Sequence, residues 1–526
     1  PLARVRSLPR RRLTALTLLA ILVVAVVAGL VASRGTSAHD RDAANSPGAA
    51  NAAATGRTLS LTVTTSNAGR AIQPGFLGLS LEYPALEAYA GSDPTAINPV
   101  FEQLIRNLTP GQAPELRIGG DTTDWTWWPV SGVPKPNGIR YSLTNDFVHV
   151  TAALTHALGA RLILGINLEL GSATDASAEA KTLVAGIGAG SIEGLELGNE
   201  PELYGSFSYY RLPNGQHVNG RPAGYDFSDY LHDFSRIGGS VPKLPLVGPA
   251  TGGPHWIPDL LSFLRAQSRV GVATLHKYPL QSCFIRPSEP QYPTLAHFLS
   301  PAASQGLANS IARYVGVAHA RHMPLRIDEM NSVSCGTAPG LSNAFGSALW
   351  ALDAVFQMAR VGVDGVNIHT YPGAPYELFT FTHSHGKWSG FAAPEYYGLL
   401  MFAQAAPAGA HLLHTSGALG NVRAWTTRAP DGTIHVVLIN DYTAQSRTIA
   451  VRIPGATGTA TLERLQAPGV SARTGVTLGG KGFGNATTTG LLSGPSNATT
   501  VTPANGGYSV TVPRASAAML TISPAG

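Results

Sequence analysis

The stretch SIEGLELGNEPELYG, residues 191–205, begins as a short apolar run and ends in residues that carry chemistry. Isoleucine, leucine and glycine positions come first, and Asn199, Glu200 and Pro201 follow them directly. An apolar run of this length is typical of a strand that is buried on both faces of a parallel sheet. The stretch therefore indicates a buried strand whose carboxyl end presents a carboxylate with an amide beside it.

Seven further apolar runs with polar endings occur between residues 75 and 405. Amphipathic segments with apolar residues at helical spacing separate most of them, as in NDFVHVTAALTHALGA (145–160) and AFGSALWALDAVFQMARVG (344–362). Eight strand-helix units predict an α/β fold, a parallel (β/α)8 TIM barrel that spans residues 75–405. The seven runs are FLGLSLEY (76–83), ELRIGGDT (115–122), RLILGINLEL (161–170), LPLVGPAT (244–251), GVATLHKYP (271–279), PLRIDEMNS (324–332) and GVDGVNIHTY (362–371).

The chain changes character after the barrel. Over residues 406–526 the runs are short and alternating, as in IHVVLINDY, RTIAVRIP and YSVTVP, with Gly, Asn and Pro between them. Such a pattern predicts an antiparallel β-sandwich. A strand-like run, LSLTVTT (59–65), precedes the barrel, and we expect the segment 59–74 to join this sandwich, which would make the domain discontinuous in sequence.

Composition and charge limit the classes of protein to which the chain can belong. The chain has 526 residues, 44% of them apolar and only 13% charged, with 59 glycines and 38 prolines, which suits a loop-rich enzyme of two domains. Six arginines within residues 1–34 account for the basic balance, because removing them from the 36 Lys and Arg leaves 30 against 31 Asp and Glu. The rest is close to neutral, so we expect no nucleic-acid partner.

The six arginines flank LTALTLLAILVVAVVAGLVA, residues 13–32, which carries no charge. A run of twenty such residues can span a bilayer as an anchor, or serve as a long signal peptide that is cleaved near Ala38. Either interpretation of residues 1–34 exports the remainder, so we expect an extracytoplasmic protein, secreted or tethered to the outer face of the membrane. Residues 35–58 are small and polar, and are predicted to form a flexible linker.

The chain has two cysteines, Cys283 and Cys335. In an exported protein they are able to form a disulfide if the fold brings them together. Two isolated cysteines are a poor metal site, and we expect neither a metal nor a cofactor.

The chemistry of a parallel barrel lies where the strands end at its carboxyl face. Glu200 ends the fourth predicted strand, and either Asp328 or Glu329 at the end of the seventh must face the same cavity, because side chains alternate along a strand. Two carboxylates about 5 Å apart, on strands that lie across the barrel mouth from each other, fit a retaining glycosidase. The residues alone leave open which carboxylate of strand seven is used.

Asn-Glu-Pro by itself is a weak motif, since a glutamate before proline also caps helices; the second carboxylate is what favours catalysis. Arg117, at the end of the second strand, would supply the charge that keeps the nucleophile ionised, and Asn199 is placed to hold a sugar hydroxyl. Other residues near the predicted mouth have two readings. They either contact the sugar or have a purely structural role. In the structural interpretation Asp121 and Asp124 order a turn, Trp125, Trp127 and Trp128 belong to the core, and His276 is a buried histidine with its hydrogen bonds made. Lys277 and Arg286 are assigned no role.

Three motifs, LGNEP (197–201), RIDEMNSVSCG (326–336) and LRIGGDTTDW (116–125), resemble those of the clan A retaining glycosidases. Within that clan the chain is similar to glycoside hydrolase family 79, the β-glucuronidases and heparanase-like enzymes, from about residue 59 onward. The run DEMNSVSCGTAPGLSNAFGSALWALD (328–353) is particularly close to fungal and bacterial members. Asn-Glu-Pro is shared by the whole clan, whereas the stretch after Glu329 is more selective.

The resemblance implies specific roles. Glu200 would be the acid/base and Glu329 the nucleophile, with Tyr278 hydrogen-bonded to the nucleophile and Asn199 at the sugar 2-hydroxyl. Glu82 matches an acidic position that holds outer hydroxyls of the glycone. The carboxylate of glucuronic acid would be read by the backbone amides of Cys335 and Gly336 and by Tyr376.

Two departures from the family pattern matter. Animal heparanases carry Gly-Gly where this chain has Cys335-Gly336, and a Cys283–Cys335 disulfide would pin the loop that bears these amides. The excised linker and the basic clusters of the animal enzymes are absent from the sequence, which disfavours endo-acting cleavage.

The sequence thus predicts a retaining glycoside hydrolase that removes β-linked glucuronic acid from glycoconjugates or polysaccharides by double displacement. The alternatives in the same class are a neutral-sugar β-glycosidase and an endo-acting heparanase-like β-glucuronidase. A different class, a non-catalytic carbohydrate-binding surface protein, is disfavoured by the intact pair Glu200 and Glu329.

Overall fold

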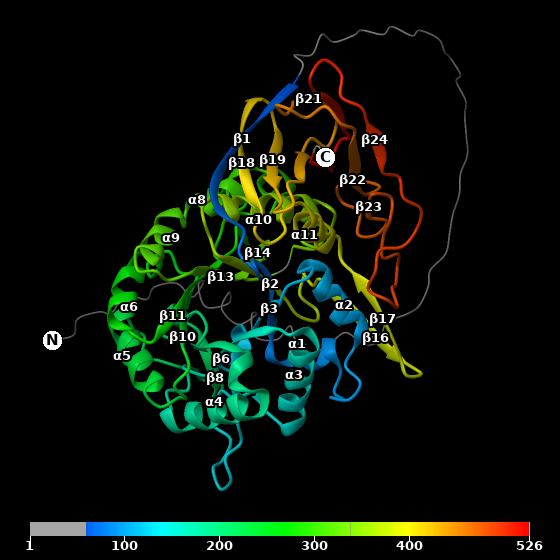
Figure 1. Cartoon of the computed structure of the whole chain (residues 1–526). Coiled ribbons are helices and arrows are strands. Elements are labelled where there is room, and N and C mark those ends of the chain that lie inside the picture. Colours follow the sequence, from blue (N-terminus) through cyan, green and yellow to red (C-terminus); the bar gives the residue numbers. More distant parts are fainter. Residues whose placement is uncertain (1–58, 337, 525–526) are drawn as a thin grey trace, which may run out of the picture. The chain divides into compact units, whose positions relative to one another are not determined.

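The computed structural model of the chain describes residues 59–336 and 338–524 (Figure 1). The predicted export segment, residues 1–34, and the predicted linker, residues 35–58, lie outside the described residues. None of the helices within the described ranges has the length and apolarity needed to span a bilayer.

Eight parallel strands close into a barrel in the order β10-β11-β13-β15-β2-β3-β6-β7. The fold-class prediction of a TIM barrel is confirmed, and each of the eight apolar runs coincides with one barrel strand to within one residue at its start or contains it. Most strands are buried along their whole length, as expected for parallel strands covered on both faces. The strands are β2 (Leu77–Glu82), β3 (Glu115–Gly119), β6 (Arg161–Ile166), β7 (Ile192–Leu197), β10 (Leu246–Thr251), β11 (Val270–Lys277), β13 (Leu325–Met330) and β15 (Gly365–Thr370).

Helices cover the outside of the barrel, and their ends follow from local sequence. Helix α3, for example, begins after Thr144, whose side chain accepts from the amide of Phe147, and ends at Gly159 in the left-handed conformation. The helices are α1 (Tyr83–Ala90), α2 (Pro99–Leu108), α3 (Asn145–Leu158), α4 (Ala173–Ile187), α5 (Phe227–Gly238), α6 (Leu260–Ala266), α7 (Leu295–Phe298), α8 (Leu307–Asn309), α9 (Ala312–His319), α10 (Gly346–Arg360) and α11 (Pro394–Ala405).

Helices α10 and α11 are buried on nearly all sides, because they lie between the barrel and the C-terminal domain. Their backbones approach closely at Gly398, where an added Cβ would lie 2.1 Å from the carbonyl oxygen of Ala348. This glycine is therefore required for the contact between the two helices.

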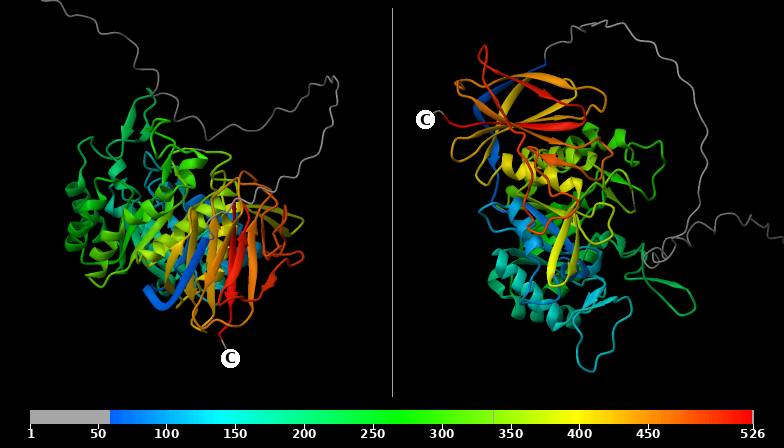
Figure 2. Two further views of the ribbon diagram at one scale, coloured as in Figure 1. Left: turned by 90° about the horizontal axis from the view of Figure 1, so that it is seen from above. Right: turned by 90° about the vertical axis from the view of Figure 1, so that its right-hand side faces the viewer.

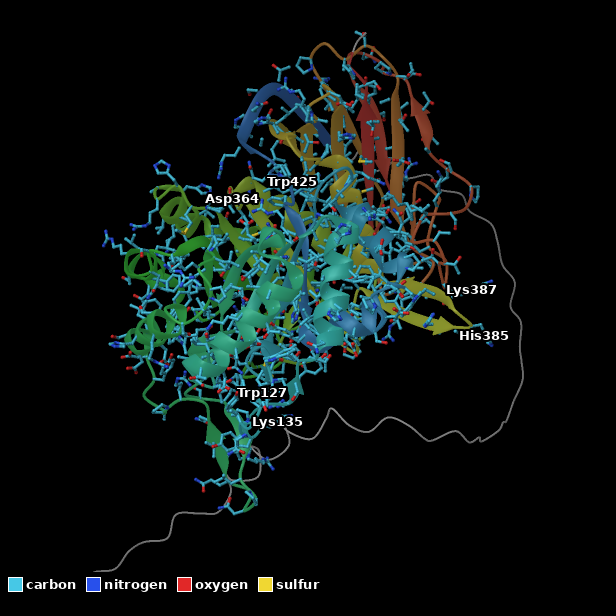
Figure 3. The ribbon with its side chains drawn as sticks, turned by 60° about the horizontal axis from the view of Figure 1, so that its bottom comes forward. Trp127, Lys135, Asp364, His385, Lys387 and Trp425 are labelled. Atoms are coloured by element: carbon cyan, nitrogen blue, oxygen red, sulfur yellow. A yellow bond between two sulfur atoms is a disulfide. The ribbon has the colours of Figure 1, made fainter. Side chains whose placement is uncertain are left out.

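Four two-stranded ribbons extend the loops that follow barrel strands. One of them, β12 with β14, joins the loop after β11 to the loop after β13 at the active-site end. Figure 3 shows the β16–β17 hairpin projecting from the barrel with His385 and Lys387 at its tip. The ribbons are β4 (Thr126–Trp127) with β5 (Tyr141–Ser142), β8 (Ser208–Arg211) with β9 (His217–Asn219), β12 (Leu280–Gln281) with β14 (Val333–Ser334), and β16 (Phe379–Ser384) with β17 (Lys387–Ala392).

The C-terminal domain is one hydrogen-bonded sheet of ten strands. Strand β22, next to one end of the sheet order, and strand β25, at the other end, contribute to the same buried core, so the sheet folds over on itself. The strands are β1 (Leu59–Ala71), β18 (His411–Ala418), β19 (Val422–Arg428), β20 (Ile434–Asn440), β21 (Arg447–Arg452), β22 (Ala460–Gln466), β23 (Thr477–Leu478), β24 (Thr499–Val501), β25 (Tyr508–Val512) and β26 (Ser516–Ile522).

Strand β1, which precedes the barrel in sequence, lies in this sheet between β18 and β21. Figure 2 shows it in blue beside the yellow and orange strands. It pairs antiparallel with β18 but parallel with β21, so the prediction of a purely antiparallel domain is wrong at this pair. The reason is that no hairpin connects β1 to β21, and a strand that arrives from a distant part of the chain is free to pair in either direction.

Trp425 of β19 connects the sheet domain to the barrel (Figure 3). Its ring is stacked on Phe356 of α10 with centroids 5.3 Å apart, and its Nε1 donates to the buried carboxylate of Asp353 at 2.8 Å. Arg423 of the same strand lies 3.0 Å from the second carboxylate oxygen of Asp353.

Replacing Trp425 by alanine should destabilise the protein by about 3 kcal/mol, because a large packed ring is lost and a buried acceptor loses its donor. Trp425→Phe keeps a ring over Phe356 but not the donor, and should cost about 1 kcal/mol. Urea unfolding followed by circular dichroism measures both. An unchanged unfolding midpoint for the alanine variant would contradict this account of the domain contact.

Candidate active site

A cavity of about 770 Å³ opens at the carboxyl ends of the barrel strands. It is lined by most of the predicted site residues: Glu82, Asp121, Asn199, Glu200, His276, Tyr278, Glu329, Cys335, Gly336 and Tyr376. Arg117 lies beneath its floor, fully buried. A second polar cavity, about 640 Å³, lies at the amino ends of the strands, where Glu115, Arg161 and Arg326 line it. In TIM barrels that end is associated with stability, so the chemistry belongs to the first cavity.

Glu200 is held in a turn after its strand. Strand β7 ends at Leu197, so Glu200 does not terminate the strand as predicted but follows three residues later, with φ 45° in the left-handed region. Gly198, also left-handed, permits this turn, because a Cβ there would lie 2.2 Å from the hydroxyl of Tyr204. The turn lifts the Glu200 carboxylate into the cavity, where its side chain is 24% exposed and Oε1 lies 3.1 Å from Nδ1 of His276.

Glu329, on β13, is surrounded by donors. Arg117 Nη1 donates to its Oε2 at 2.6 Å, and the Tyr278 hydroxyl donates to its Oε1 at 2.9 Å. Although burial by itself would raise the pKa of Glu329, the positive charges of His369, His276 and Arg117 hold that pKa well below its usual value. Glu329 is therefore ionised at neutral pH.

The two glutamates are close together. A carboxylate oxygen of Glu200, a ring nitrogen of His276 and a carboxylate oxygen of Glu329 all lie within 4.8 Å of one another. Strands β7 and β13 do not lie opposite each other as predicted, since only β10 and β11 separate them in the barrel. The separation suits the short spacing of a retaining glycosidase, about 5 Å, and is too small for an inverting one, about 6.5–9.5 Å.

Asp328 and Glu329 both face the interior, contrary to the expected alternation. Asp328 Oδ2 lies 3.8 Å from Arg117 Nε, below Glu329 and outside the lining of the cavity. The reason is a register shift: Thr274 pairs with Arg326 and His276 with Glu329, so three residue steps of β13 oppose two of β11. The bulge turns a second carboxylate inward.

Arg117 connects the groups beneath the cavity. Besides Glu329, it donates through Nε to Glu196 at 2.7 Å and through Nη2 to the side-chain oxygen of Asn199 at 2.9 Å. Its side chain is 0% exposed. Burial opposes its charge, but the carboxylates of Glu196, Asp328 and Glu329 raise the pKa of Arg117 well above the usual value, so it stays charged.

Two groups of side chains have the spacing of metal ligands. One contains Glu196, His276 and Asp328, and the other contains Glu200, His276 and Glu329. Arg117 donates to Glu196 and Glu329 and contacts Asp328, so it already provides the positive charge that a cation would bring. The donor set is therefore compensated without a metal, and we assign it none.

His276 belongs to the site and is not an isolated structural histidine. Burial by itself would lower its pKa, but the carboxylates of Glu329 and Asp328 and the hydrogen bond to Glu200 raise it to about 10. It is therefore protonated at neutral pH, with Nε2 3.6 Å from Asp328 and Nδ1 directed at Glu200.

Glu82 and Asn199 are both hydrogen-bonded to Asp121. Glu82 accepts from the backbone amides of Asp121 and Thr122, at 3.2 and 2.8 Å, and Oε1 lies 3.3 Å from Nε2 of His369. Asn199 donates to the carboxylate of Asp121 at 3.2 Å. These side chains form the wall of the cavity between β2, β3 and β7.

Asp124 also lines the cavity, but its carboxylate is held by hydrogen bonds from the surrounding backbone and from Tyr204. Its buried carboxylate accepts from the amides of Leu168, Glu169 and Asn199 and from the hydroxyl of Tyr204. It thereby holds the turn that carries Glu200. Of the tryptophans proposed for sugar stacking, Trp125 lines the cavity, whereas Trp127 is buried and Trp128 packs against the core.

Several residues that line the site were missed by sequence reasoning. His369 and Tyr371 come from the end of β15, where the run NIHTY offers the polar ending seen on the other strands. His369 contacts both Glu82 and the nucleophile candidate, Glu329, at 3.3 and 3.4 Å. Lys277 lines the cavity too; burial lowers its pKa, and within the described residues its ammonium has no acidic partner.

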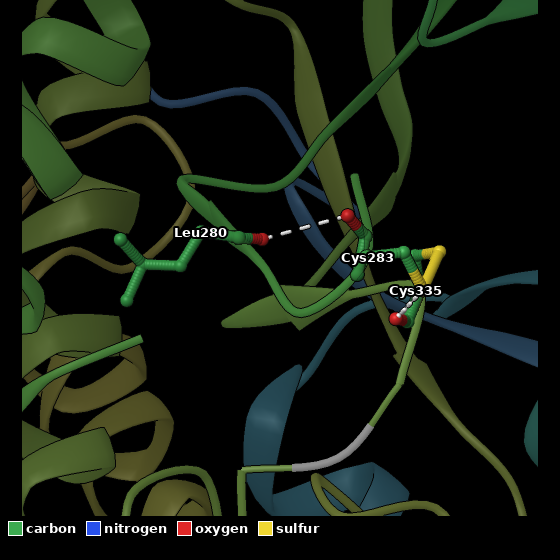
Figure 4. Close-up of a disulfide and its surroundings, with 4 residues drawn as sticks. Leu280, Cys283 and Cys335 are labelled. Atoms are coloured by element: carbon green, nitrogen blue, oxygen red, sulfur yellow. Dashed lines mark hydrogen bonds between the residues drawn. A yellow bond between two sulfur atoms is a disulfide. The ribbon is translucent and has the colours of Figure 1, made fainter. Parts of the chain in front are cut away.

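Cys283 and Cys335 form a disulfide that joins the loops after β11 and β13 (Figure 4). The β12–β14 ribbon lies directly beside it. Cys335 and Gly336 both have positive φ, 56° and 131°, and both line the cavity. Tyr376 is buried on the facing wall, with its ring centroid 6.1 Å from that of Tyr278. The disulfide thus fixes a stretch of cavity wall near these two tyrosines.

A TIM barrel whose cavity holds two carboxylates at this spacing fits the class of glycoside hydrolases. The comparisons with known proteins agree. Residues 415–519 match the glycosyl hydrolase family 79 C-terminal beta domain. A beta-glucuronidase of Aspergillus niger is 23% identical over 457 residues, which cover 77% of this chain and 82% of that protein.

A beta-glucuronidase of Neurospora crassa is 24% identical over 364 residues, 62% of each chain. The fold is also that of a 4-O-α-L-rhamnosyl-β-D-glucuronidase from Fusarium oxysporum, with a TM-score of 0.68 and 23% identity over 88% of this chain and 100% of that one. The chain is thus similar to the beta-glucuronidases of two fungi along most of its length, and its C-terminal domain matches that of glycoside hydrolase family 79.

The charge of His276 makes stability depend on pH. Its folded pKa, about 10, lies above the unfolded value of 6.5, so its contribution is full below pH 6.5 and is lost as the pH rises toward 10. Within that window the folded state binds about one proton more than the unfolded state. Raising the pH therefore lowers the free energy of unfolding by about 1.4 kcal/mol per pH unit.

We expect His276→Gln to flatten this dependence. Urea unfolding of both proteins at pH 6.5, 8 and 9.5 measures it, with His149→Gln, at an exposed helix position, as the control. Parallel curves for the wild type and the His276 variant would show that His276 is neutral in the folded protein.

Proposed function

We propose that this protein is an exo-acting β-glucuronidase that hydrolyses its substrate with retention of anomeric configuration. The observation that carries the proposal is the approach of Glu200 and Glu329 within 4.8 Å in one cavity, with Arg117 on the second carboxylate. The relatives named beta-glucuronidase support the choice of sugar.

In the first step Glu329 attacks the anomeric carbon while Glu200 gives its proton to the glycosidic oxygen. Glu329 suits the nucleophile, because its lowered pKa keeps it ionised and Tyr278 and Arg117 orient both of its oxygens. Glu200 becomes anionic as it gives up the proton. The protonated His276, hydrogen-bonded to Oε1 of Glu200, stabilises that new charge.

In the second step Glu200, now ionised, takes a proton from water, and the resulting hydroxide releases the sugar from Glu329. The partial exposure of Glu200 gives water access to it. Asn199 is held by Arg117 with its amide toward the cavity, which supports a contact with the sugar hydroxyl next to the anomeric carbon.

The preference for glucuronic acid is supported by hydrogen-bond donors that line the cavity. Cys335 and Gly336 line the cavity in left-handed conformations, and Tyr376 lies across from them with a pKa that burial raises well above its usual value, so its hydroxyl remains a donor. Lys277 adds an ammonium on the same cavity. A carboxylate on the sugar would receive charge-assisted hydrogen bonds that a neutral hydroxymethyl group lacks.

We also propose that the enzyme acts outside the cytoplasm. The Cys283–Cys335 disulfide supports this location, since such bonds persist in oxidising compartments.

A panel of chromogenic sugars tests the substrate. The β-glucuronide should be hydrolysed at least 100-fold faster, in kcat/KM, than the β-glucoside or the β-xyloside, since a buried charge-assisted contact contributes roughly 3 kcal/mol. Tyr376→Phe should reduce the value for the glucuronide about tenfold and leave the glucoside nearly unchanged. Faster cleavage of the glucoside would remove the glucuronate assignment, and equal losses would remove the role of Tyr376.

Azide rescue tests the two roles. Glu329→Ala should be inactive and should form an α-glycosyl azide, because azide enters the space of the missing nucleophile. Glu200→Ala, supplied with a substrate whose leaving group needs no acid, should yield the β-azide. Nuclear magnetic resonance of the products gives the anomeric configuration. The opposite pair of products would reverse the roles.

A further inference from the structure

Two exposed phenylalanine rings meet at the mouth of the active-site cavity. Phe207 is 43% exposed and Phe284 is 78% exposed, and their ring centroids lie 6.1 Å apart with the planes at 78°. Phe207 is itself part of the cavity lining. Across the described ranges, the only other large apolar side chains so exposed are Val133 and Leu491. Two of four such side chains thus gather at one place, which marks a binding surface.

Local structure holds both rings in position. Phe207 follows the short helix Pro201–Leu203, and its amide donates to the carbonyl of Leu203 at 3.0 Å. Phe284 follows Cys283 directly and has φ 58°, a left-handed conformation that is unfavourable for a residue with a side chain. The disulfide fixes the backbone next to it. An unfavourable conformation kept at the edge of a cavity points to a use for the ring.

The aromatic pair lies on the leaving-group side of the cavity. Phe207 comes seven residues after Glu200 in the loop that follows β7, so it shares the loop of the residue that protonates the departing group. The sugar side is formed instead by the loops after β2 and β15, with Glu82, His369 and Tyr376. A group that leaves past Glu200 therefore departs beside the loop that carries Phe207, whose ring contacts Phe284.

We propose that Phe207 and Phe284 form an aglycone site that selects β-glucuronides whose leaving group is an aromatic ring. Phenyl rings offer apolar surface and no hydrogen-bonding group, which suits a flat aromatic ring better than a sugar bearing hydroxyls. The open angle between the two rings admits a third in an edge-to-face arrangement. The inference rests on the proposed function, because it assigns the other half of the same substrate.

Hydrolysis of phenyl β-D-glucuronide and of methyl β-D-glucuronide by the full-length enzyme tests the site. Phe207→Ala and Phe284→Ala should each lower kcat/KM for the phenyl substrate about tenfold, since a ring-ring contact with its buried area is lost. The methyl substrate, which cannot reach the pair, should change less than twofold. Comparing each variant with the wild type on the same substrate removes the difference in leaving-group acidity.

Two further variants sharpen the result. Phe284→Leu keeps apolar bulk without a flat ring and should give a smaller loss than the alanine variant. Leu491→Ala removes another exposed apolar side chain, one that does not line the cavity, and should change neither substrate. Transfer of the glucuronosyl group to benzyl alcohol rather than methanol gives a second readout, and the alanine variants should lose that preference.

The outcomes are distinct. Equal losses on the phenyl and methyl substrates, or no loss on either, would overturn the aglycone site while leaving the proposed function intact. A larger loss on a β-glucuronosyl disaccharide than on the phenyl substrate would assign the pair to a sugar ring and overturn the aromatic preference. Failure of the unaltered enzyme to hydrolyse either glucuronide would overturn the proposed function, and the aglycone site with it.

Discussion

The buried guanidinium of Arg117 is the interaction on which the site depends. A charge without exposure to water is costly unless charged and hydrogen-bonding partners surround it. Here each guanidinium nitrogen donates to a different partner. Nε donates to Glu196 of β7, Nη1 to Glu329 of β13 and Nη2 to the side chain of Asn199. Because these partners come from different strands, one cation fixes the relative position of the residues that would act on the sugar. The barrel brings them near, and Arg117 sets their orientation.

The charges around Arg117 are balanced as a group. Five ionisable side chains, Glu196, Asp328, Glu329, His276 and His369, lie within one buried network with it. Burial opposes ionisation of Glu329, yet its cationic neighbours lower its pKa and hold it ionised, and the carboxylates in turn raise the pKa of both histidines. A carboxylate that acts as a nucleophile must be ionised, and these neighbouring charges keep it so. The acid Glu200, by contrast, lies at the exposed edge of the network, where water reaches it.

The sheet domain contributes to the site at a distance. It packs through Trp425 on α10, the next long helix after strand β13, which bears Glu329, and after the loop that bears Cys335 and Gly336. The family match over residues 415–519 falls within this domain and contains none of the catalytic candidates. Likeness in that region therefore identifies the scaffold, whereas the chemistry is carried by the ends of the barrel strands.

The sequence by itself determined the eight barrel strands, the change to short alternating strands and the residues Glu200 and Arg117, because buried parallel strands leave an apolar pattern that depends only on neighbours along the chain. Tertiary structure alone decided that both Asp328 and Glu329 point inward, since a bulge arises from pairing with β11. It also decided that β1 runs parallel to β21 and that Phe207 meets Phe284. These features join segments distant in sequence, and strand register and ring contacts are set by the partner rather than by local pattern.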